Sequence, residues 1–593
     1  MAYAPAVHRD GDAAAQASRI LADTQVSPAI ISALIRRVKA LTSRLIDREV
    51  DEDTITSTEG LVTPAVVSAF HEIGGDFGDA VPYCLLEARK KFLRDAARQP
   101  LDYTLNSRRA LATVVVARRL VAHIERLAVA GGQAQSHLCL TKKFRRIEAD
   151  GDVSLPTSAL ESAIDQHTTI LLSSTESQKV VGAIWSGDLV QRYGPDGYSY
   201  FEPYEARDDG AFLAHFDPAR LAVPRYSYVI NITIWIFFLV LFTVQTRTYK
   251  EFDLAEGLLW VMAAGYIIED ASRWIKIGGI DSITFWTVLD VATNGLFLVS
   301  FSLRIASFVA HGHAAADLYQ LRAFQFLACV APLVWIQLLK LFDGFVYFGI
   351  LQVIILRMAK ETAIFFTLLA LVMVGFFHAF YALDAADESR IDDAVVKIID
   401  NLTQTLLGGA DFDLFSDQSI FSKVLYQAYC FLIAVILLNV LVAFFGTAYS
   451  DVVESAHDTY AGFFSEKVIG MVRAPDQYVY LAPFNLIEVF LIAPLEYVLP
   501  RHAYARLNYG IQSVVFGLPL FLIAFYESRL ARKVGAIMLQ EPESELDEAR
   551  GAGIGGTIED PEIPQDEQMP GLRLARTRFD DILAMALEGS GKH

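Results

Sequence analysis

The chain has 593 residues, of which 53% are hydrophobic, and its formal net charge is −19 at pH 7. This acidic balance argues against a nucleic-acid-binding protein, which would need a basic face. The four cysteines lie far apart in the sequence, so they predict neither a disulfide framework nor a metal site. Long apolar runs begin only after Pro224, which predicts a soluble region followed by a membrane region.

The first domain is predicted to span residues 1–220. It opens without the apolar core of a secretory signal, so we expect this domain to stay in the cytosol. Apolar residues recur at spacings of three and four in 17–45 and 61–130, which predicts helices. The segments 138–148 and 169–190 are more typical of short strands. The domain is therefore expected to be helical or α+β.

Four basic residues lie close together in this domain: Lys142, Lys143, Arg145 and Arg146. Contact with anionic lipid headgroups, phosphoinositides among them, is one interpretation of such a cluster. The alternative is a solvated strand edge.

Six stretches are long and apolar enough to cross a membrane, for which ~20 residues are needed. They are 226–245, 254–269, 283–303, 318–341, 362–383 and 424–449. The second stretch is the weakest, because it is short and ends in Glu269 and Asp270. Six crossings place both termini on one side, which we take to be the cytosolic side. The first four spans, within 221–341, are expected to form a peripheral bundle.

Residues 342–361 are predicted to form a linker helix along the cytosolic membrane surface. The uncharged run from Gly344 to Leu356 is too short to cross, and charged residues bound it at Asp343 and Arg357. The alternative is that this run extends a neighbouring span.

A pore loop is predicted between the fifth and sixth spans, within a pore domain of residues 362–450. A short helical pattern from Val395 to Leu406 comes before two glycines and two carboxylates. Irregular backbone at membrane depth is tolerated only where it lines water or is buried in protein. Glycines let carbonyl groups approach an ion path, and a carboxylate repeated around a symmetry axis makes a cation-selecting ring. The candidate selectivity filter is Gly408, Gly409, Ala410, Asp411 and Asp413, with Asp411 the first candidate for contact with a metal ion.

The loop around this motif is strongly acidic. Between Asp384 and Asp417 there are nine acidic residues and two basic ones. Such a mouth would raise the local concentration of cations. The alternative is an ordinary solvated loop, but its position beside a Gly-Gly turn between two spans favours the pore.

The sixth span contains the sequence Leu437-Leu438-Asn439-Val440-Leu441-Val442-Ala443-Phe444-Phe445-Gly446. This sequence resembles the end of the sixth span in transient receptor potential (TRP) channels, and Pro483-Phe484-Asn485 resembles a segment found downstream of it in several branches. The short pore loop, the absence of ankyrin repeats and the acidic tail are most similar to the fungal vacuolar branch. The tryptophan–lysine box of animal members is missing after the sixth span.

This resemblance implies a homotetrameric, calcium-permeable cation channel of the vacuole membrane, which releases stored calcium in response to cytosolic calcium and membrane stretch. Calcium would then be the permeant ion and a regulator, with no cofactor required. By the same resemblance, Asn439 matches a pore-facing asparagine, and Val442 and Phe445 match the lower gate. An apolar ring can close a pore by dewetting. The alternative for Asn439 is a hydrogen bond between helices.

A calcium site is conceivable near the cytosolic ends of the second and third spans. Glu269, Asp270, Asp290 and Asn294 offer the oxygen ligands that Ca²⁺ prefers. The favoured alternative is ion pairing of these carboxylates with Arg273, Lys276 or Lys340, because intramembrane carboxylates are usually partnered.

After the pore, residues 451–535 are predicted to contain a helix and an apolar hairpin, re-entrant or on the membrane surface. Two further spans or a packed cytosolic layer are the alternatives. The tail, 536–593, has ten acidic residues and one base between Glu541 and Glu567, which predicts disorder. Its candidate calcium-sensing residues are Glu541, Glu543, Glu545, Asp547 and Glu548.

Together these features predict a mainly α membrane protein with a six-span, TRP-like and voltage-gated-like channel fold, a pore loop and a cytosolic N-terminal domain. The function predicted is cation permeation rather than catalysis, because no nucleophile motif, metal-ligand set or phosphate loop is present in the sequence. A secondary cation transporter is the alternative, although that class calls for paired repeats with broken helices in both halves.

Overall fold

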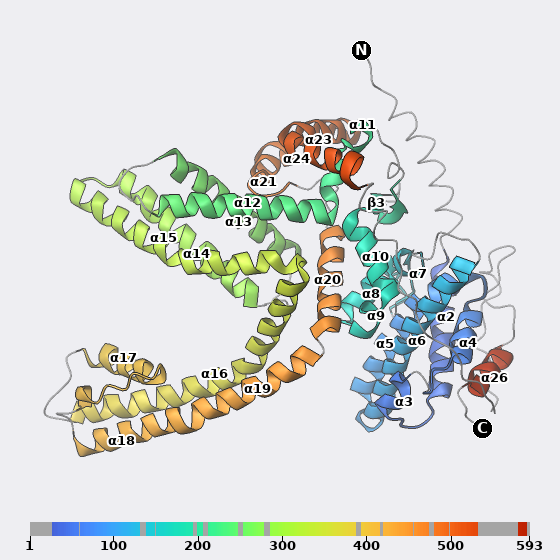
Figure 1. Cartoon of the computed structure of the whole chain (residues 1–593), viewed down its shortest axis with the longest axis horizontal. Helices are drawn as coiled ribbons and strands as arrows, with labels where there is room; N and C mark the ends of the chain where they lie inside the picture. Colours follow the sequence, from blue (N-terminus) through green and yellow to red (C-terminus); the bar gives the residue numbers. More distant parts are fainter. Residues whose placement is uncertain are drawn as a thin grey trace, which may run out of the picture. The chain divides into compact units, whose positions relative to one another are not determined.

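A computed structural model describes residues 26–57, 60–130, 138–148, 150–193, 199–204, 212–246, 253–277, 285–386, 393–415, 419–454, 456–473, 480–496, 499–531 and 579–589. Most of these residues are helical (Figure 1), as the predicted fold class requires. They form two compact units. The first comprises Met1–Gly278, Phe301–Phe324 and Ala461–His593, and the second comprises Gly279–Ser300 and Gln325–Tyr460.

The N-terminal domain is built around a helical core, and its first long helices begin at caps written in the sequence. Ser27 caps α2 and Thr63 caps α4, and each is followed by a proline at the first helical position. A proline there loses no hydrogen bond, because the first N–H groups of a helix have no partner within it. The helices of this part are α2 (Pro28–Leu45), α3 (Glu52–Thr56), α4 (Pro64–Gly74), α5 (Val81–Arg98) and α6 (Tyr103–Ala130).

The second half of this domain corrects one prediction. Of the two segments expected to be strands, 169–190 is helical over α9 (Thr169–Leu172) and α10 (Thr175–Ser186). Ser174 caps α10, and Gly187 ends it with φ +80°. These two signals overrode the β-branched residues between them, because caps fix where a helix begins and ends.

The remaining elements of the domain are short. Residues 138–148 contain both a helical turn and a strand. The elements are α7 (Leu138–Thr141), β1 (Lys143–Phe144), β2 (Thr157–Ser158), α8 (Ala159–Asp165), β3 (Leu189–Tyr193), β4 (Ser199–Pro203) and α11 (Phe212–His215). Strand β1 pairs with β2, and β3 pairs with β4, both antiparallel.

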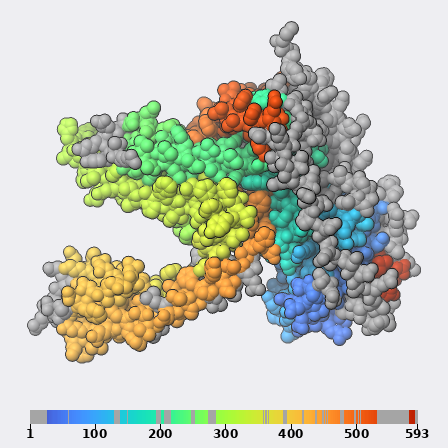
Figure 2. All heavy atoms as spheres, in the orientation of Figure 1, coloured from blue at the N-terminus to red at the C-terminus, as the bar shows by residue number. Residues whose placement is uncertain are grey.

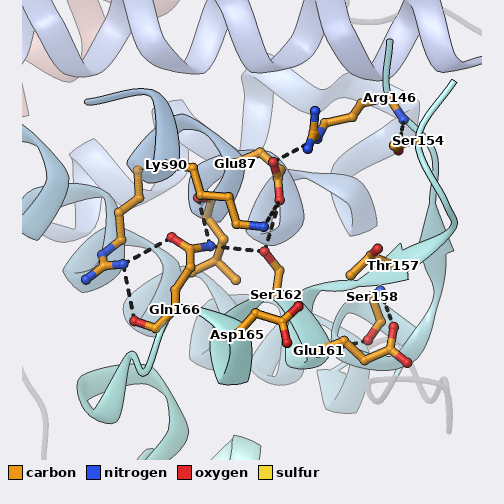
Figure 3. A network of polar contacts seen from close by, with 12 residues as sticks. Glu87, Lys90, Arg146, Ser154, Thr157, Ser158, Glu161, Ser162, Asp165 and Gln166 are labelled. Carbon is orange, nitrogen blue, oxygen red and sulfur yellow. Dashed lines mark hydrogen bonds and ion pairs between the residues drawn. The ribbon is translucent and has the colours of Figure 1, made fainter. Parts of the chain in front are cut away.

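A buried carboxylate ties β1 and its neighbours to α5 (Figure 3). Glu87 accepts hydrogen bonds from Lys90 Nζ (2.7 Å) and Ser162 Oγ (3.1 Å), and Arg146 Nε lies 2.8 Å from it. Lys143 pairs with Glu161 at 3.0 Å. Two members of the basic cluster are therefore engaged within the domain, which leaves less charge for a lipid headgroup than the sequence suggests.

Five helices of the described segments are long and apolar enough to cross a membrane: Pro224–Gln245, Phe285–Val309, His313–Gly344, Phe365–Ala386 and Ile420–Gly446. They belong to α12 (Pro224–Gln245), α14 (Phe285–Val309), α15 (His313–Leu341), α16 (Val346–Ala386), α18 (Ile420–Phe431) and α19 (Leu438–Glu454). The second predicted span lies in α13 (Leu254–Ile277), which is not among the five. Glu256 near the start of α13 and Glu269 near its end shorten its apolar run.

The linker predicted over 342–361 is continuous with the fifth span, because α16 runs unbroken from Val346 to Ala386. Its sequence has no proline, and the charged residues between its two apolar runs are good helix formers. Figure 1 shows α16 changing direction along its length. That its first part lies on the membrane surface remains a prediction.

After the sixth span come α20 (Ala456–Val472), α21 (Asn485–Ile487), α22 (Ala493–Glu496), α23 (Arg501–Val515) and α24 (Gly517–Phe525). The pair Arg506–Val515 and Gly517–Arg529 is bent by 79°. Gly517 and Pro519 open the second arm, which explains the break. Phe516 and Leu520 pack there with Leu221, Val223 and Tyr226. The hairpin therefore has a buried side supplied by the chain around the start of α12.

The predicted disordered tail contains a helix. Its last part, α26 (Phe579–Gly589), is helical and buries Phe579, Ile582 and Leu583 in the N-terminal core. Disorder was wrong for these residues, since apolar side chains at spacings of three and four can fold against a partner surface. The five candidate calcium-sensing carboxylates of the tail, Glu541 to Glu548, lie outside the described residues.

Candidate functional site

The predicted pore loop is a half-length helix followed by an irregular turn. The helix is α17 (Ala394–Leu406), and it leads into the filter residues and a single 3-10 turn at Asp413–Phe415. Figure 1 shows α17 beside the paired lengths of α16 and α18. Ile398 and Leu402 are fully buried against Phe380 and Tyr429 of these two helices.

The turn after α17 requires glycine at one position. Gly408 has φ +90°, a backbone conformation that other residues rarely adopt. The next glycine, Gly409, donates its N–H to the carbonyl of Gln404 at 2.8 Å. Gly408, Gly409, Ala410, Asp411 and Asp413 are all exposed in the single chain.

Hydrogen bonds hold the backbone carbonyl of Asp411 and one of its two carboxylate oxygens, which leaves the other carboxylate oxygen open. Asn401 Nδ2 donates to the Asp411 carbonyl at 2.8 Å, and Asp411 Oδ1 accepts the N–H of Asp413 at 2.9 Å. Asn401 is itself buried. Two residues of the predicted filter are therefore fixed relative to α17, as a structure that must hold an ion at defined distances requires.

Two tyrosines of α18, which were not among the predicted site residues, contact the same helix. Tyr426 Oη lies 2.6 Å from Thr405 Oγ1, and Tyr429 Oη donates to the Leu402 carbonyl at 3.1 Å. Both tyrosines are buried. Their spacing with Ile433 and Leu437 on one helical face is the signal in the sequence, but by itself it indicates only a membrane span.

The sixth span is interrupted just before the residues of the predicted gate. Residues Leu432–Leu437 form a π-helical segment between α18 and α19. Such segments occur frequently at functional sites. Asn439 follows at once, and its Nδ2 donates to the Val435 carbonyl at 2.8 Å. This bond is made within its own helix, so it differs from the interhelical bond considered as the alternative.

The gate residues differ in how exposed they are. The Val442 side chain is 71% exposed in the single chain, whereas Phe445 is half-buried. Asn439 and Gly446 are exposed on the face next to Val442. In an assembly of several copies, this face is free to contact a neighbour or line an axis.

The four residues of the conceivable membrane calcium site belong to both compact units. Glu269 and Asp270 lie on α13 in the first unit, and Asp290 and Asn294 lie on α14 in the second. Asp290 forms an ion pair with Lys340 Nζ at 2.6 Å and accepts a hydrogen bond from Gln337 at 3.1 Å. Across the described ranges, no group of three or more His, Cys, Asp or Glu is placed to hold a metal ion.

A second ion pair joins α13 to α14. Arg304 donates to both oxygens of Glu256, each at 2.7 Å, and both side chains are buried. The pair is bidentate, which is the geometry that best compensates for removing two charges from water. It explains why α13 carries a carboxylate inside an otherwise apolar stretch.

Glu527 is the centre of a buried polar cluster that the sequence did not predict. It follows α24 and accepts hydrogen bonds from Arg220 Nε (3.0 Å) and Tyr226 Oη (2.7 Å), and His215 Nδ1 lies 2.9 Å away. Burial would lower the pKa of Arg220, but the adjacent Glu527 carboxylate outweighs it and raises that pKa. The cluster joins the end of the N-terminal domain, the start of α12 and the post-pore hairpin.

Helix α20, which follows the sixth span, is fastened to the N-terminal domain at two places. Gln178 Nε2 donates to Ser465 Oγ at 3.0 Å, and Arg473 pairs with Asp165 at 2.7 Å. Between them, Lys467 Nζ lies 4.1 Å from the centroid of the Tyr228 ring, and burial lowers the Lys467 pKa to about 7. A helix that follows the sixth span in the sequence is thus bound directly to the N-terminal domain.

Comparison with known proteins gives two family matches. Residues 234–528 match the family described as "Calcium channel YVC1-like, C-terminal", and residues 31–216 match the "TRPY1 N-terminal linker helical domain". The chain is 31% identical over 517 residues to the calcium channel YVC1 of Candida albicans, covering 84% of this chain and 74% of that one. It is 30% identical over 522 residues to the calcium channel YVC1 of Saccharomyces cerevisiae, covering 84% and 76%.

A solved structure is similar over nearly the whole chain. It is full-length TRPY1 in detergent with PI3P and calcium bound, and the TM-score is 0.67 at 25% sequence identity. The likeness covers 87% of this chain and 90% of that one. The predicted TRP-type fold with an N-terminal helical domain is confirmed.

Proposed function

From the premise that the chain belongs to the family of YVC1-like calcium channels, we propose that it is a tetrameric, calcium-permeable cation channel that releases stored calcium into the cytosol. Its curated relatives are named calcium channels, so the protein is a channel and not an enzyme. Gating by cytosolic calcium and membrane stretch, and residence in a fungal vacuole membrane with both termini in the cytosol, are part of the same proposal.

The single observation that carries this proposal is the anchored loop after α17. A helix with one buried face, a glycine with positive φ and an Asp411 carbonyl held by Asn401 together make a rigid turn with exposed carboxylates. Four copies of this turn around an axis would present four Asp411 side chains to passing ions. Carboxylate rings of this kind select cations.

Recording from planar bilayers or isolated vacuoles, with Asp411→Asn beside the wild type and calcium varied on each side, tests the filter. We expect discrete cation currents, with lower calcium permeability or conductance in Asp411→Asn. Glu466→Gln, an exposed carboxylate on α20 outside this acidic loop, serves as the control and should leave permeation unchanged. Currents indifferent to Asp411 would move the filter to Asp413 or to the backbone carbonyls. Saturable flux without discrete currents would favour a transporter.

Calcium is proposed as a regulator and anionic lipid as a partner, since the solved TRPY1 structure contains both calcium and PI3P. The contact between Asp290 and Lys340 bears on where calcium would act. A carboxylate already paired with a lysine must exchange that partner for the ion. Asp290→Asn should therefore weaken activation by cytosolic calcium, measured as a rightward shift of the calcium dose–response. Glu541→Gln with Glu543→Gln tests the tail by the same measurement.

A further inference from the structure

The C-terminal helix α26 buries a face that suits it to bind as a separable peptide. Its buried residues recur at the spacing of one helical face: Phe579, Ile582, Leu583, Ala586 and Leu587. Three of these, Phe579, Ile582 and Ala586, have no exposed surface. Such an amphipathic stripe is the pattern by which a helix occupies an apolar groove.

The surface that receives α26 belongs to the first helices of the N-terminal domain. Helix α26 contacts α4 and α2, and its apolar residues join the same core as Val66, Val67 and Phe70. Figure 1 shows α26, in red, beside α4. Segments more than 480 positions apart in the sequence therefore share one core.

Helices α26 and α2 carry charges of opposite sign. Helix α26 carries Asp580, Asp581 and Glu588 and no basic residue, whereas α2 carries four basic residues and no acid. At the contact itself, the Arg37 guanidinium lies 6.0 Å from the centroid of the Phe579 ring. This is within the range of a cation–π interaction. Helix α26 is thus opposite in charge to α2, one of the two helices that receive it.

Helix α26 would not be stably helical on its own. It has 11 residues, and isolated helices shorter than ~12–15 residues are marginal in water. It is joined to the rest of the chain through residues 532–578, which make a connection of 47 residues (578 − 532 + 1). This covalent connection makes the binding of α26 intramolecular, so the helix does not have to reach its site from free solution.

We propose that α26 is a detachable latch, a helical ligand that binds the groove formed by α2 and α4 and can leave it without unfolding the N-terminal domain. The groove is a specific binding surface for an acidic amphipathic helix of the pattern Phe-x-x-Ile-Leu-x-x-Ala-Leu.

The test uses full-length channels in detergent and a fluorescent peptide covering residues 577–591. In the double variant Ile582→Asp, Leu583→Asp, two buried side chains become charged, so the latch should open and vacate the groove. The peptide should bind this variant at least tenfold more tightly than it binds the wild type, whose own α26 fills the site. Met585→Asp, on the exposed face of α26, should behave as the wild type does.

A peptide carrying Ile582→Asp should bind none of these channels. Failure of the unmodified peptide to bind the double variant, or equal binding to double variant and wild type, would overturn the proposal. If the double variant does not assemble, a protease site placed within residues 560–566 allows the same question to be asked of an otherwise wild-type channel.

After cleavage of the assembled channel, the released fragment should exchange with labelled peptide while the N-terminal domain stays folded. A fragment that leaves at once with no peptide binding in its place would show that no groove exists, and a fragment that exchanges only on unfolding would show that α26 is a fixed part of the core. Binding is measured without currents, so either failure is distinguishable from failure of the channel proposal.

Discussion

At the residue scale, the pore loop depends on a few side chains that hold the backbone. Asn401 is buried, and its amide nitrogen reaches the carbonyl of Asp411, the residue proposed to meet the ion. The adjacent glycines Gly408 and Gly409 differ in backbone conformation, since only Gly408 has a positive φ. These differences allow position-specific predictions within a stretch of 11 residues.

Asn401→Ala should lower calcium selectivity without preventing assembly. The lost hydrogen bond is worth ~0.5–1.5 kcal/mol, enough to loosen the Asp411 backbone but small beside the stability of a domain. Bi-ionic reversal potentials measure the change. Gln404→Ala, on the exposed side of the same helix, should leave them unaltered. Equal shifts in both variants would mean that Asn401 has no special role.

Gly408→Ala should reduce conduction strongly, whereas Gly409→Ala should be mild. An alanine at φ +90° carries backbone strain of order ~1–3 kcal/mol, which would move the loop. At Gly409 the added methyl group would meet only the Gln404 carbonyl at 3.6 Å, an ordinary contact. Single-channel conductance of the two variants is the measurement, and the reverse order would contradict the observed turn.

At the element scale, helices are joined by buried charges and by one partly buried lysine. Glu527 joins η10 (Tyr526–Ala531), the segment that follows α24, to Arg220 and to Tyr226 of α12. Lys467 lies on α20 against the Tyr228 ring. Both contacts connect elements distant in sequence, so removing one partner should affect the association of those elements more than their helicity.

Glu527→Gln should destabilise the protein by about 3–5 kcal/mol, because Arg220 would remain buried without its carboxylate. Thermal unfolding of the detergent-solubilised protein, with an unchanged helical circular dichroism signal before the transition, measures the loss. Glu466→Gln, an exposed carboxylate on α20, is the control and should stay within about 0.5 kcal/mol of wild type.

Lys467 predicts a pH dependence with a defined sign. Its ordinary pKa is 10.5, and burial lowers the native value to about 7. Between those pH values the unfolded chain binds more protons than the native protein, so stability should rise with pH from about 7 upward. Lys467→Met should lose this rise, while Lys179→Met, at an exposed position, should keep it. Unfolding midpoints at pH 7, 8 and 9 provide the comparison.

At the scale of the whole molecule, a single copy leaves large apolar side chains exposed along the predicted pore helices. Phe421 is 72% exposed and Val442 71%. Figure 2 shows atoms of α18 and α19, in orange, on the surface of the single chain. Monomeric soluble proteins rarely expose contiguous apolar surface of this extent, so lipid or further copies of the chain must cover it. Because the family is one of channels, the simplest interpretation is that further copies of the chain, arranged around an axis, cover these apolar side chains.

Native mass spectrometry in detergent should therefore give four copies.

Val442→Ser should raise the resting open probability, since a polar ring wets more readily than an apolar one. Val440→Ser, on another face of α19, should change it less. A stable monomer, or equal effects of the two serines, would argue against the proposed assembly and gate.

The sequence by itself determined the fold class, because membrane spans and helical periodicity are local features of the sequence. An apolar run of ~20 residues identifies a candidate span without knowledge of its partners. It also located the loop with Gly408 and Asp411, since glycines and carboxylates between two spans have few structural uses. Only the tertiary structure decided what Asn401, Tyr426 and Glu527 do, because the role of a buried polar group depends on its partners, which here lie 10, 21 and 307 residues away in the sequence. The strands expected in 169–190 were wrong because the local caps Ser174 and Gly187 outweighed the strand propensity of the residues between them. The disorder expected of 579–589 was wrong because a distant part of the chain, the N-terminal domain, supplies the surface on which these residues pack.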